Sequence, residues 1–297
     1  MSQDGFSNTK TASNTTTASE STTTDAAKSK DSLQPVDIER RDNGLVVVTL
    51  NRPEKYNALS IDMFKAIVAA GHSLKNDTSV RAIVLRGAGK GFCAGLDLEN
   101  FQKMQSESGL FEDGLGEYPN IFQDVAWVWK KMPVPVIAAL HGVAYGGGLQ
   151  IALGADIRIA APGTKLSVME IKWGLIPDMS GTQTLRDLTR IDIAKELTFT
   201  GRIVLAEEAQ RIGLVTFVED DPFKAAIEMA EAITQKSPDA IAAGKRLFET
   251  VWHGEETAGL QAEEKEQTAL MGSSNQLEAV FSNLQKRPAN YNPRKSQ

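Results

Sequence analysis

The chain has 297 residues, of which 41% are hydrophobic and 24% charged, a composition typical of a globular protein with a hydrophobic core. Its formal charge of −6 argues against a nucleic-acid partner, and no apolar run reaches the roughly 18 residues that a membrane span needs. The single cysteine, Cys93, excludes an intrachain disulfide framework and a cysteine-rich zinc site, so we expect a soluble, cytoplasmic protein.

The first segment, residues 1–34, consists mostly of Ser, Thr, Asn and other small polar residues. Such a segment buries too little apolar surface to offset the entropy lost on ordering, so we predict a disordered tail. A transit peptide is the alternative interpretation. The tail is rich in Ser and Thr, but it contains no arginine and carries several acidic residues, which a transit peptide usually lacks.

An alternating pattern over residues 36–50 marks the start of the folded part. These residues read as two strands joined by an Asn-Gly turn, which predicts a β-hairpin. Ser60 then precedes apolar residues that recur at helical spacing over 61–68. Since serine is a preferred N-cap, a helix is expected to begin there.

Three later runs are short and apolar, as buried parallel strands are: RAIVLRG (81–87), PVIAALHG (135–142) and ADIRIA (155–160). Helical periodicity then dominates over residues 182–200, 206–212, 223–236, 238–251 and 256–285. Strands that alternate with helices predict an α/β fold built from parallel β/α units. We therefore divide the chain into a tail (1–34), a β/α core (35–200) and a helical C-terminal region (201–297).

Two glycine-rich segments carry the chemical signal: GAGKGFCAGLDLENF (87–101) and HGVAYGGGLQIALGADI (141–157). They do not match the common nucleotide motifs, because Phe92 replaces the third glycine of a dinucleotide fingerprint and the phosphate-loop spacing fails at both ends. Ser180 also lacks the preceding glycine of a serine-hydrolase elbow.

What remains is a pair of loops that each present backbone N–H groups at the start of a helix, where negative charge is favoured. Two N–H groups that converge on one carbonyl oxygen form an oxyanion hole. The loops also fit a plainer interpretation as ordinary strand-to-helix turns, which are frequent in α/β proteins.

Several further segments occur in a recognisable order: NRPEKYNAL (51–59), VRAIVLRGAGKGFCAGLDL (80–98), HGVAYGGG (141–148), SVMEIKWGLIPDMSGTQTL (167–185) and FTGRIVLAEEAQRIGLV (199–215). Together they resemble the crotonase superfamily of enoyl-CoA hydratases and isomerases over roughly residues 36–290. This resemblance implies a spiral core of ββα units and a helical C-terminal region used in assembly into homotrimers or dimers of trimers. It also implies acyl-CoA thioester substrates, with coenzyme A as part of the substrate and no metal or redox cofactor.

The resemblance also assigns roles to single residues. It implies that the backbone N–H groups of Leu96 and Gly147 form the oxyanion hole. Binding of coenzyme A would involve Arg52, Lys55, Tyr56, Ala94 and Lys286, the last from a neighbouring helix or subunit. For the cationic residues, a solvated surface position is the alternative. We assign no nucleophilic role to Cys93, since no histidine in the motif activates it and small buried thiols are common.

The carboxylates depart from the two-glutamate pattern of the hydratases. The second glutamate corresponds to Glu170, in a run that looks like a strand, but the first falls on Gln150, whose amide cannot exchange a proton near neutral pH. Asp178, eight residues after Glu170, resembles the aspartate of the dienoyl-CoA isomerase branch, which also has an aspartate where this chain has Gln150. Alternatively, Asp178 is the N-cap of a helix that begins near Met179.

We therefore predict an acyl-CoA enzyme in which Glu170, Asp178 and Gln150 shift a double bond through an enolate. Hydration of 2-enoyl-CoA with Glu170 as the main acid/base is the first alternative. A catalytically inactive acyl-CoA-binding protein is the second, and thioester hydrolysis or dehalogenation on the same fold also stays open. The segment 102–125 is expected to shape the acyl pocket.

Overall fold

The computed structural model of the chain describes residues 34–97 and 119–296. The tail predicted over residues 1–34 therefore lies outside the described residues, apart from Gln34. So does most of the segment 102–125 that we expect to shape the acyl pocket. Everything stated below about structure refers to the described ranges.

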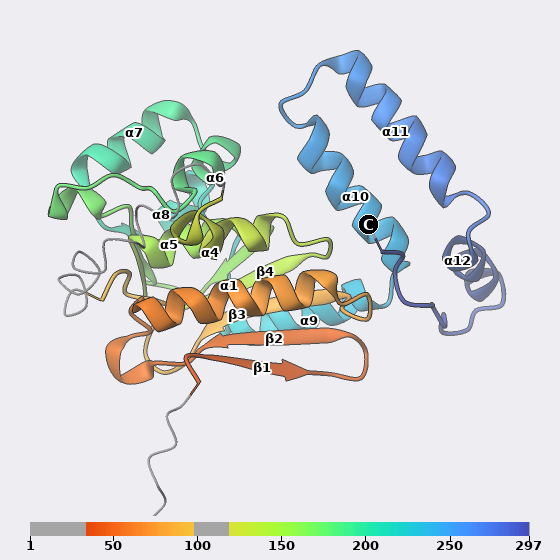
Figure 1. Ribbon diagram of the computed structural model, residues 1–297, viewed down its shortest axis with the longest axis horizontal. Helices are drawn as coiled ribbons and strands as arrows, with labels where there is room; N and C mark the ends of the chain where they lie inside the picture. Colours follow the sequence, from red (N-terminus) through yellow and green to blue (C-terminus); the bar gives the residue numbers. More distant parts are fainter. Residues whose placement is uncertain (1–33, 98–118, 297) are drawn as a thin grey trace, which may run out of the picture. The chain divides into compact units, whose positions relative to one another are not determined.

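The main sheet runs in the order β1-β2-β3-β4-β6-β9 (Figure 1). Its strands are β1 (Val36–Arg40), β2 (Leu45–Leu50), β3 (Ala82–Gly87), β4 (Val136–Leu140), β6 (Ile157–Ala160) and β9 (Phe217–Val218). The first pair is antiparallel, which confirms the predicted hairpin, and all other neighbours are parallel. The α/β prediction with parallel β/α units is thus confirmed.

A second sheet, in the order β5-β7-β8, consists of β5 (Val143–Tyr145), β7 (Lys165–Ser167) and β8 (Val204–Leu205). Strands β8 and β9 both follow residue 200, the boundary that we predicted between core and helical region. Both sheets therefore draw on the segment after that boundary. A strand of two residues is too short to leave an alternating pattern in the sequence.

The longer helices are α1 (Ile61–Asn76), α4 (Ile121–Lys130), α5 (Gly147–Leu153), α6 (Gly181–Leu188), α7 (Ile191–Thr200), α8 (Ala206–Arg211), α9 (Pro222–Thr234), α10 (Pro238–Val251), α11 (Glu256–Leu270) and α12 (Ser274–Leu284). There are also two 3₁₀ helices among the described residues, η1 (Pro53–Lys55) and η2 (Glu170–Trp173). In the sequence, η1 precedes the first glycine-rich segment and η2 follows the second. After residue 200 the described chain is mainly helical, as the periodicity predicts.

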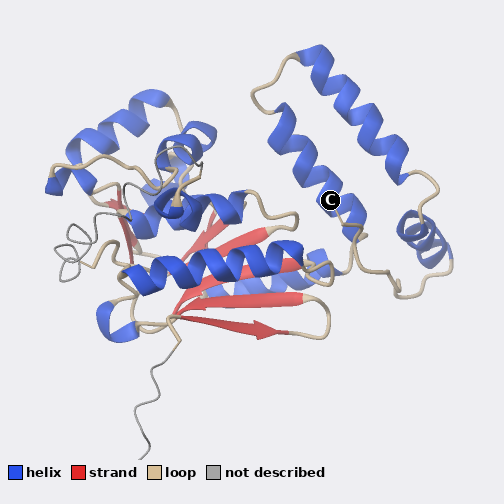
Figure 2. Ribbon diagram, viewed as in Figure 1, coloured by secondary structure: helices blue, strands red, loops and turns tan. Residues whose placement is uncertain are grey.

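Helices bury both faces of the main sheet. Along β2, Val46, Val48 and Leu50 face one core cluster, and Leu45 and Val47 face the other. Helices α1 and α4 cover the first face, and α9 covers the second; Figure 2 shows α1 in front of the strands and α9 behind them. Because both faces of β2, β3 and β4 are buried, these strands read as continuous apolar runs, whereas β1 at the edge is largely exposed.

Helix α1 begins where the sequence predicts. The Ser60 hydroxyl accepts a hydrogen bond from the Met63 N–H at 3.3 Å, as an N-cap does. The apolar stripe of α1 then packs on α4, where the rings of Phe64 and Phe122 meet edge to face with centroids 5.1 Å apart. This packing closes one side of the core.

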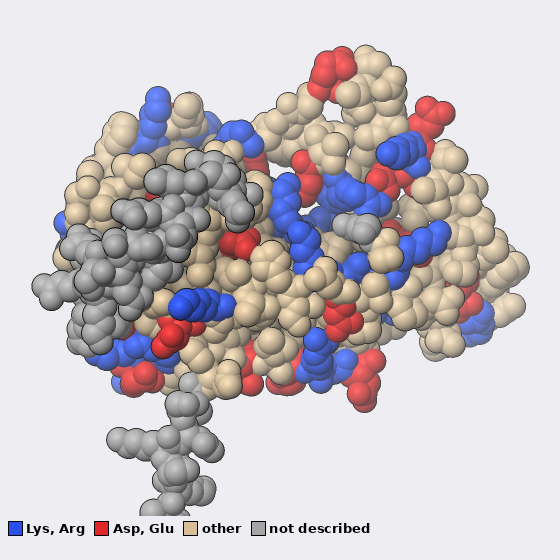
Figure 3. Space-filling model, viewed as in Figure 1, with Lys and Arg blue, Asp and Glu red and all other residues tan. Residues whose placement is uncertain are grey.

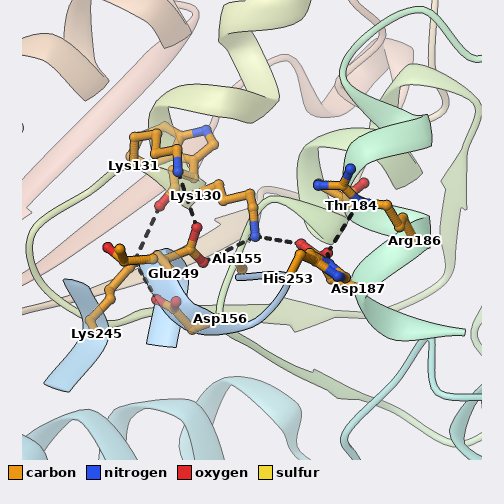
Figure 4. A network of polar contacts seen from close by, with 12 residues as sticks. Lys130, Lys131, Ala155, Asp156, Thr184, Arg186, Asp187, Lys245, Glu249 and His253 are labelled. Carbon is orange, nitrogen blue, oxygen red and sulfur yellow. Dashed lines mark hydrogen bonds and ion pairs between the residues drawn. The ribbon is translucent and has the colours of Figure 1, made fainter. Parts of the chain in front are cut away.

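A network of partly buried ion pairs joins α10 to the core. Figure 4 shows the Lys130 ammonium between Asp187 at 2.7 Å and Glu249 at 3.0 Å. Burial alone would lower the pKa of Lys130, but hydrogen bonds to the two carboxylates outweigh it and raise the pKa above its ordinary value. The Lys245 ammonium adds a second pair with Asp156 at 2.7 Å. The cations of this junction are thus held by carboxylates of the same chain.

Charges of both signs are interspersed on the face shown in Figure 3. No helix in the described part of the chain combines the length and the hydropathy that a membrane crossing demands.

Replacement of Lys130 by methionine tests the junction. Lys130→Met leaves the carboxylates of Asp187 and Glu249 partly buried without their shared cation, so we expect a loss of about 2–3 kcal/mol in the free energy of unfolding, measured by urea titration. Lys131→Met is the matched control, because Lys131 is more exposed and has one longer ion pair, at 3.3 Å; we expect a loss below about 1 kcal/mol. Equal losses would contradict the role given to burial.

Candidate active site

A buried asparagine shapes the first glycine loop. Asn57 is fully buried, and its side-chain amide donates to the carbonyl oxygens of Ala88, Gly91 and Phe92 at 2.9–3.0 Å. Its Oδ1 accepts from the Arg52 N–H at 2.8 Å. Sequence reasoning missed Asn57, although it lies within a quoted motif. The one feature that could have identified this residue is its type, because asparagine tolerates the left-handed conformation that Asn57 adopts with φ 57°.

The two glycine loops run side by side. The Cys93 N–H donates to Val143 O at 3.1 Å, and the Tyr145 N–H donates to Cys93 O at 3.0 Å. Gly95 has φ +87°, and a Cβ there would lie 2.6 Å from Tyr145 O and 3.6 Å from the Gly147 nitrogen. A side chain at this position would therefore push the loops apart, so glycine is required for their approach.

The structure thus brings together the two segments that carry the expected oxyanion donors. Gly147 is the first residue of α5, so its N–H has no acceptor within the helix. The Leu96 N–H follows Gly95 directly, and it donates none of the hydrogen bonds found within the described residues. Both groups are therefore available to a carbonyl oxygen of a bound molecule.

Glu170 lies against the second loop. It is the first residue of η2, which corrects the prediction of a strand-like run at this position; β7 ends three residues earlier, at Ser167. A four-residue apolar run does not distinguish a strand from a helical turn. One carboxylate oxygen, Oε1, lies 3.3 Å from the place where Gly146 would carry a Cβ.

The electrostatics of Glu170 favour its neutral form. Only 9% of the residue is exposed, and burial raises the pKa of its carboxyl, with a smaller contribution from the charge of Asp178. A hydrogen bond from the Gln150 side chain to Oε1, at 2.6 Å, opposes this shift by stabilising the carboxylate. The other oxygen, Oε2, is buried and has no hydrogen-bond partner within the described residues.

Asp178 is not the N-cap of the following helix. That position belongs to Ser180, which has φ 63° and makes no capping hydrogen bond with its side chain; its hydroxyl donates instead to Gln123 O at 3.1 Å. Asp178 is exposed, and neighbouring protein atoms desolvate its carboxyl in part, which raises the pKa of this group. Because Asp178 also raises the pKa of Glu170, the two carboxyls interact.

Gln150 is held at both ends of its amide. Its Oε1 accepts from the N–H groups of Met179 at 2.9 Å and Gly181 at 3.0 Å, and its Nε2 donates to Glu170. A Cβ on Gly181 would lie 2.4 Å from this Oε1, so the amide fits only against glycine. Gly181 is a second residue that sequence reasoning missed, and its only signal was a glycine at the start of a helix.

The residues expected to bind coenzyme A fall into two places. The Arg52 guanidinium pairs with Asp97 at 3.1 Å, beside the exposed Tyr56, and the Ala94 N–H donates to Tyr56 O at 2.9 Å. Lys55 is exposed on the intervening 3₁₀ turn. Lys286 directly follows Gln285, the C-cap of α12, and is exposed.

Comparison with known proteins identifies the family of this chain. The family model for enoyl-CoA hydratase/isomerase matches residues 40–294. A methylglutaconyl-CoA hydratase of Mus musculus, named as mitochondrial, is 34% identical over 272 residues, which cover 89% of this chain and 84% of the relative. A short-chain-enoyl-CoA hydratase of Clostridium acetobutylicum is 33% identical over 253 residues, 84% of this chain and 95% of that protein.

Solved structures agree as well. An enoyl-CoA hydratase of Bacillus anthracis superposes with a TM-score of 0.79 at 30% identity, covering 87% of this chain and 99% of that one. One from Mycobacterium smegmatis gives 0.76 at 32% identity, covering 86% and 98%. The chain belongs to the enoyl-CoA hydratase/isomerase family and has the crotonase fold, which confirms the predicted resemblance. It is an acyl-CoA enzyme of that type.

The buried thiol of Cys93 gives a test of the loop packing. Its Sγ donates to Asn57 O at 3.1 Å, and burial raises the thiol pKa to about 12. We expect Ellman's reagent to modify the native protein at least ~100-fold more slowly than the chain unfolded in guanidinium. In the native protein the thiol stays protonated and the reagent cannot reach it. Fast stoichiometric modification of the native protein would contradict the packing of the two loops.

Proposed function

We propose that this enzyme moves a carbon–carbon double bond within an enoyl-CoA thioester. The observation that carries the proposal is the place of Glu170: its buried carboxyl lies against the second glycine loop, 3.3 Å from where Gly146 would carry a Cβ, and burial raises its pKa. Asp178 precedes Met179, whose side chain packs against Gly147, and the pKa of its carboxyl is raised as well. A raised pKa brings a carboxyl closer to the range in which it can both take and release a proton.

In the proposed reaction, the N–H groups of Leu96 and Gly147 donate to the thioester oxygen. One carboxylate removes a proton from C2 of a 3-enoyl-CoA, and the electron pair spreads onto the oxygen as a dienolate. A carboxyl then delivers a proton to C4, and the double bond moves from C3–C4 to C2–C3. Each donor contributes about 3 kcal/mol to the stabilisation of the enolate-like transition state. Neither step requires a metal or a redox cofactor.

Gln150 argues against two-glutamate hydration. Its amide cannot exchange a proton, and its Oε1 already accepts two backbone hydrogen bonds, so this oxygen is not free to accept from a water. Hydration of 2-enoyl-CoA with Glu170 alone is the second candidate, favoured by the hydratase names of the relatives. An inactive acyl-CoA-binding protein is the third.

Recognition of coenzyme A is proposed for Arg52, Lys55, Tyr56 and Ala94 on one chain and for Lys286 of a neighbouring copy. We further propose a homotrimer or a dimer of trimers. Its support is the set of exposed apolar side chains on the last two helices: Leu260, Leu277, Val280, Phe281 and Leu284. The cytoplasm is our proposed location, with a transit-peptide role for residues 1–34 as the competing hypothesis, since the mouse relative is named as mitochondrial.

Turnover of defined CoA esters tests the reaction. With 3-enoyl- or 3,5-dienoyl-CoA we expect the absorbance change that a shift of the double bond produces. Glu170→Gln should lower kcat by about 10³-fold and Asp178→Asn by about 10²-fold, because each removes a group that transfers protons. Asp192→Asn, a change of the same type on the surface of α7, should leave kcat unchanged.

Other outcomes identify the competing functions. Hydration of 2-enoyl-CoA with no change of the other esters, lost in Glu170→Gln but kept in Asp178→Asn, would replace isomerisation by hydration. Tight ester binding without turnover, and without exchange of α-protons in heavy water, would favour the inactive binding protein.

The acid limb of the pH profile follows from the carboxyl pKa values. The base must be ionised to accept a proton, and burial raises the pKa values of Glu170 and Asp178. Activity should therefore fall, as the pH decreases, at a higher pH than an ordinary exposed carboxyl would give. A measured kcat/KM profile with its acid limb at the ordinary carboxyl value would contradict the burial of the catalytic base.

A further inference from the structure

One buried side-chain amide connects three elements of the candidate site: helix α5, the 3₁₀ helix that carries Glu170, and the start of α6. Gln150 belongs to α5, whose first residue supplies the Gly147 N–H. Its Nε2 reaches Glu170 on η2 at 2.6 Å, and its Oε1 reaches the backbone of Met179 and Gly181. Only 1% of Gln150 is exposed, so these contacts form without competition from bulk water.

The orientation of this amide is fixed by its partners. Met179 and Gly181 both offer N–H donors, so the amide oxygen must face them. The NH₂ group is then directed at Glu170, whose Oε1 can only accept from it. The opposite orientation would place the NH₂ group against two backbone donors and leave all of them unpaired.

This arrangement makes the two oxygens of Glu170 unequal. Oε1 is occupied by the Gln150 N–H, whereas Oε2 is buried and unpartnered within the described residues. We propose that Gln150 is a positioning residue that confines proton transfer to Oε2 of Glu170 and ties the Asp178 turn to the same helix as the Gly147 N–H. The inference rests on the proposed function, since it takes Glu170 as the group that transfers protons.

A glutamate at position 150 would act differently. One of its oxygens would still accept from Met179 and Gly181, but the other would face Oε1 of Glu170 at the 2.6 Å that now separates donor and acceptor. Two carboxylates at that distance cannot both be ionised and must share a proton. Glutamine instead leaves Glu170 free to ionise. Asp178 is then the one charged side chain of the described residues found to influence its pKa.

The titration of Glu170 in the substrate-free enzyme tests the inference independently of any activity. The protein carries ¹³Cδ-labelled glutamate, and the Glu170 signal is the one that disappears in Glu170→Gln. Gln150→Met keeps the approximate shape but removes the donor, so the pKa of Glu170 should rise above that of the wild type. Gln150→Glu should give two coupled titration steps.

The same variants also separate positioning from substrate binding. Gln150→Met should lower kcat for isomerisation by about 10²-fold, change KM by less than ~3-fold, and move the acid limb to higher pH. Gln183→Glu on the exposed surface of α6 is the matched control and should behave as the wild type in every measurement. Should Gln150→Met not fold, Gln150→Glu still keeps the oxygen that accepts from α6.

Each result bears on one hypothesis. An unchanged Glu170 titration in Gln150→Met and Gln150→Glu would overturn the positioning role and leave Gln150 as packing alone. Shifted titrations in an enzyme that turns over no enoyl-CoA would uphold the positioning role and reject the proposed function.

Discussion

The site depends on the contact of two backbone turns that have no side chains between them. Gly95 and Gly148 belong to loops that lie far apart in the sequence; a Cβ on Gly95 would lie 2.6 Å from Tyr145 O, and one on Gly148 would lie 2.5 Å from Cys93 O. Such contact is stable only if the loops cannot relax apart. The Asn57 amide secures one loop through three carbonyl oxygens, and backbone hydrogen bonds between Cys93 and the second sheet secure the other side.

Burial then determines the chemistry that this contact can support. A carboxylate in the interior is costly unless hydrogen bonds stabilise it, and Glu170 has such a bond on one oxygen only. Desolvation raises the pKa of this carboxyl and the hydrogen bond from Gln150 opposes that rise, a balance that suits a group that must both take and release a proton. Lys130 illustrates the opposite balance: although it is partly buried, two carboxylates more than compensate for the desolvation and raise its pKa.

Much of the fold could be read from local patterns, and much of the site could not. The hairpin, the Ser60 cap and the buried strands follow from alternation, turn chemistry and apolar runs. The sequence did not predict the 3₁₀ turn at Glu170, because four residues are too few to define a helical or strand periodicity. Ser180 was not predicted as the N-cap position of α6, because its hydroxyl donates to α4 and does not cap its own helix. The Gln150 contacts join residues 20 to 31 positions apart, which no local pattern encodes. The roles of Leu96 and Gly147, and the domain boundary at residue 200, stay predictions.

The start of α6 shows how closely two positions that are distant in the sequence depend on each other in the structure. The helix has no side-chain cap of its own and takes its capping acceptor from Gln150, while the space for that amide exists only because residue 181 has no Cβ. A larger residue at 181 would expel the amide, and a shorter one at 150 would leave both an uncapped helix and a void. Homologues without an amide at the position of Gln150 should therefore tolerate residues other than glycine at the position of Gly181. The identities of these two residues should thus vary together across the family.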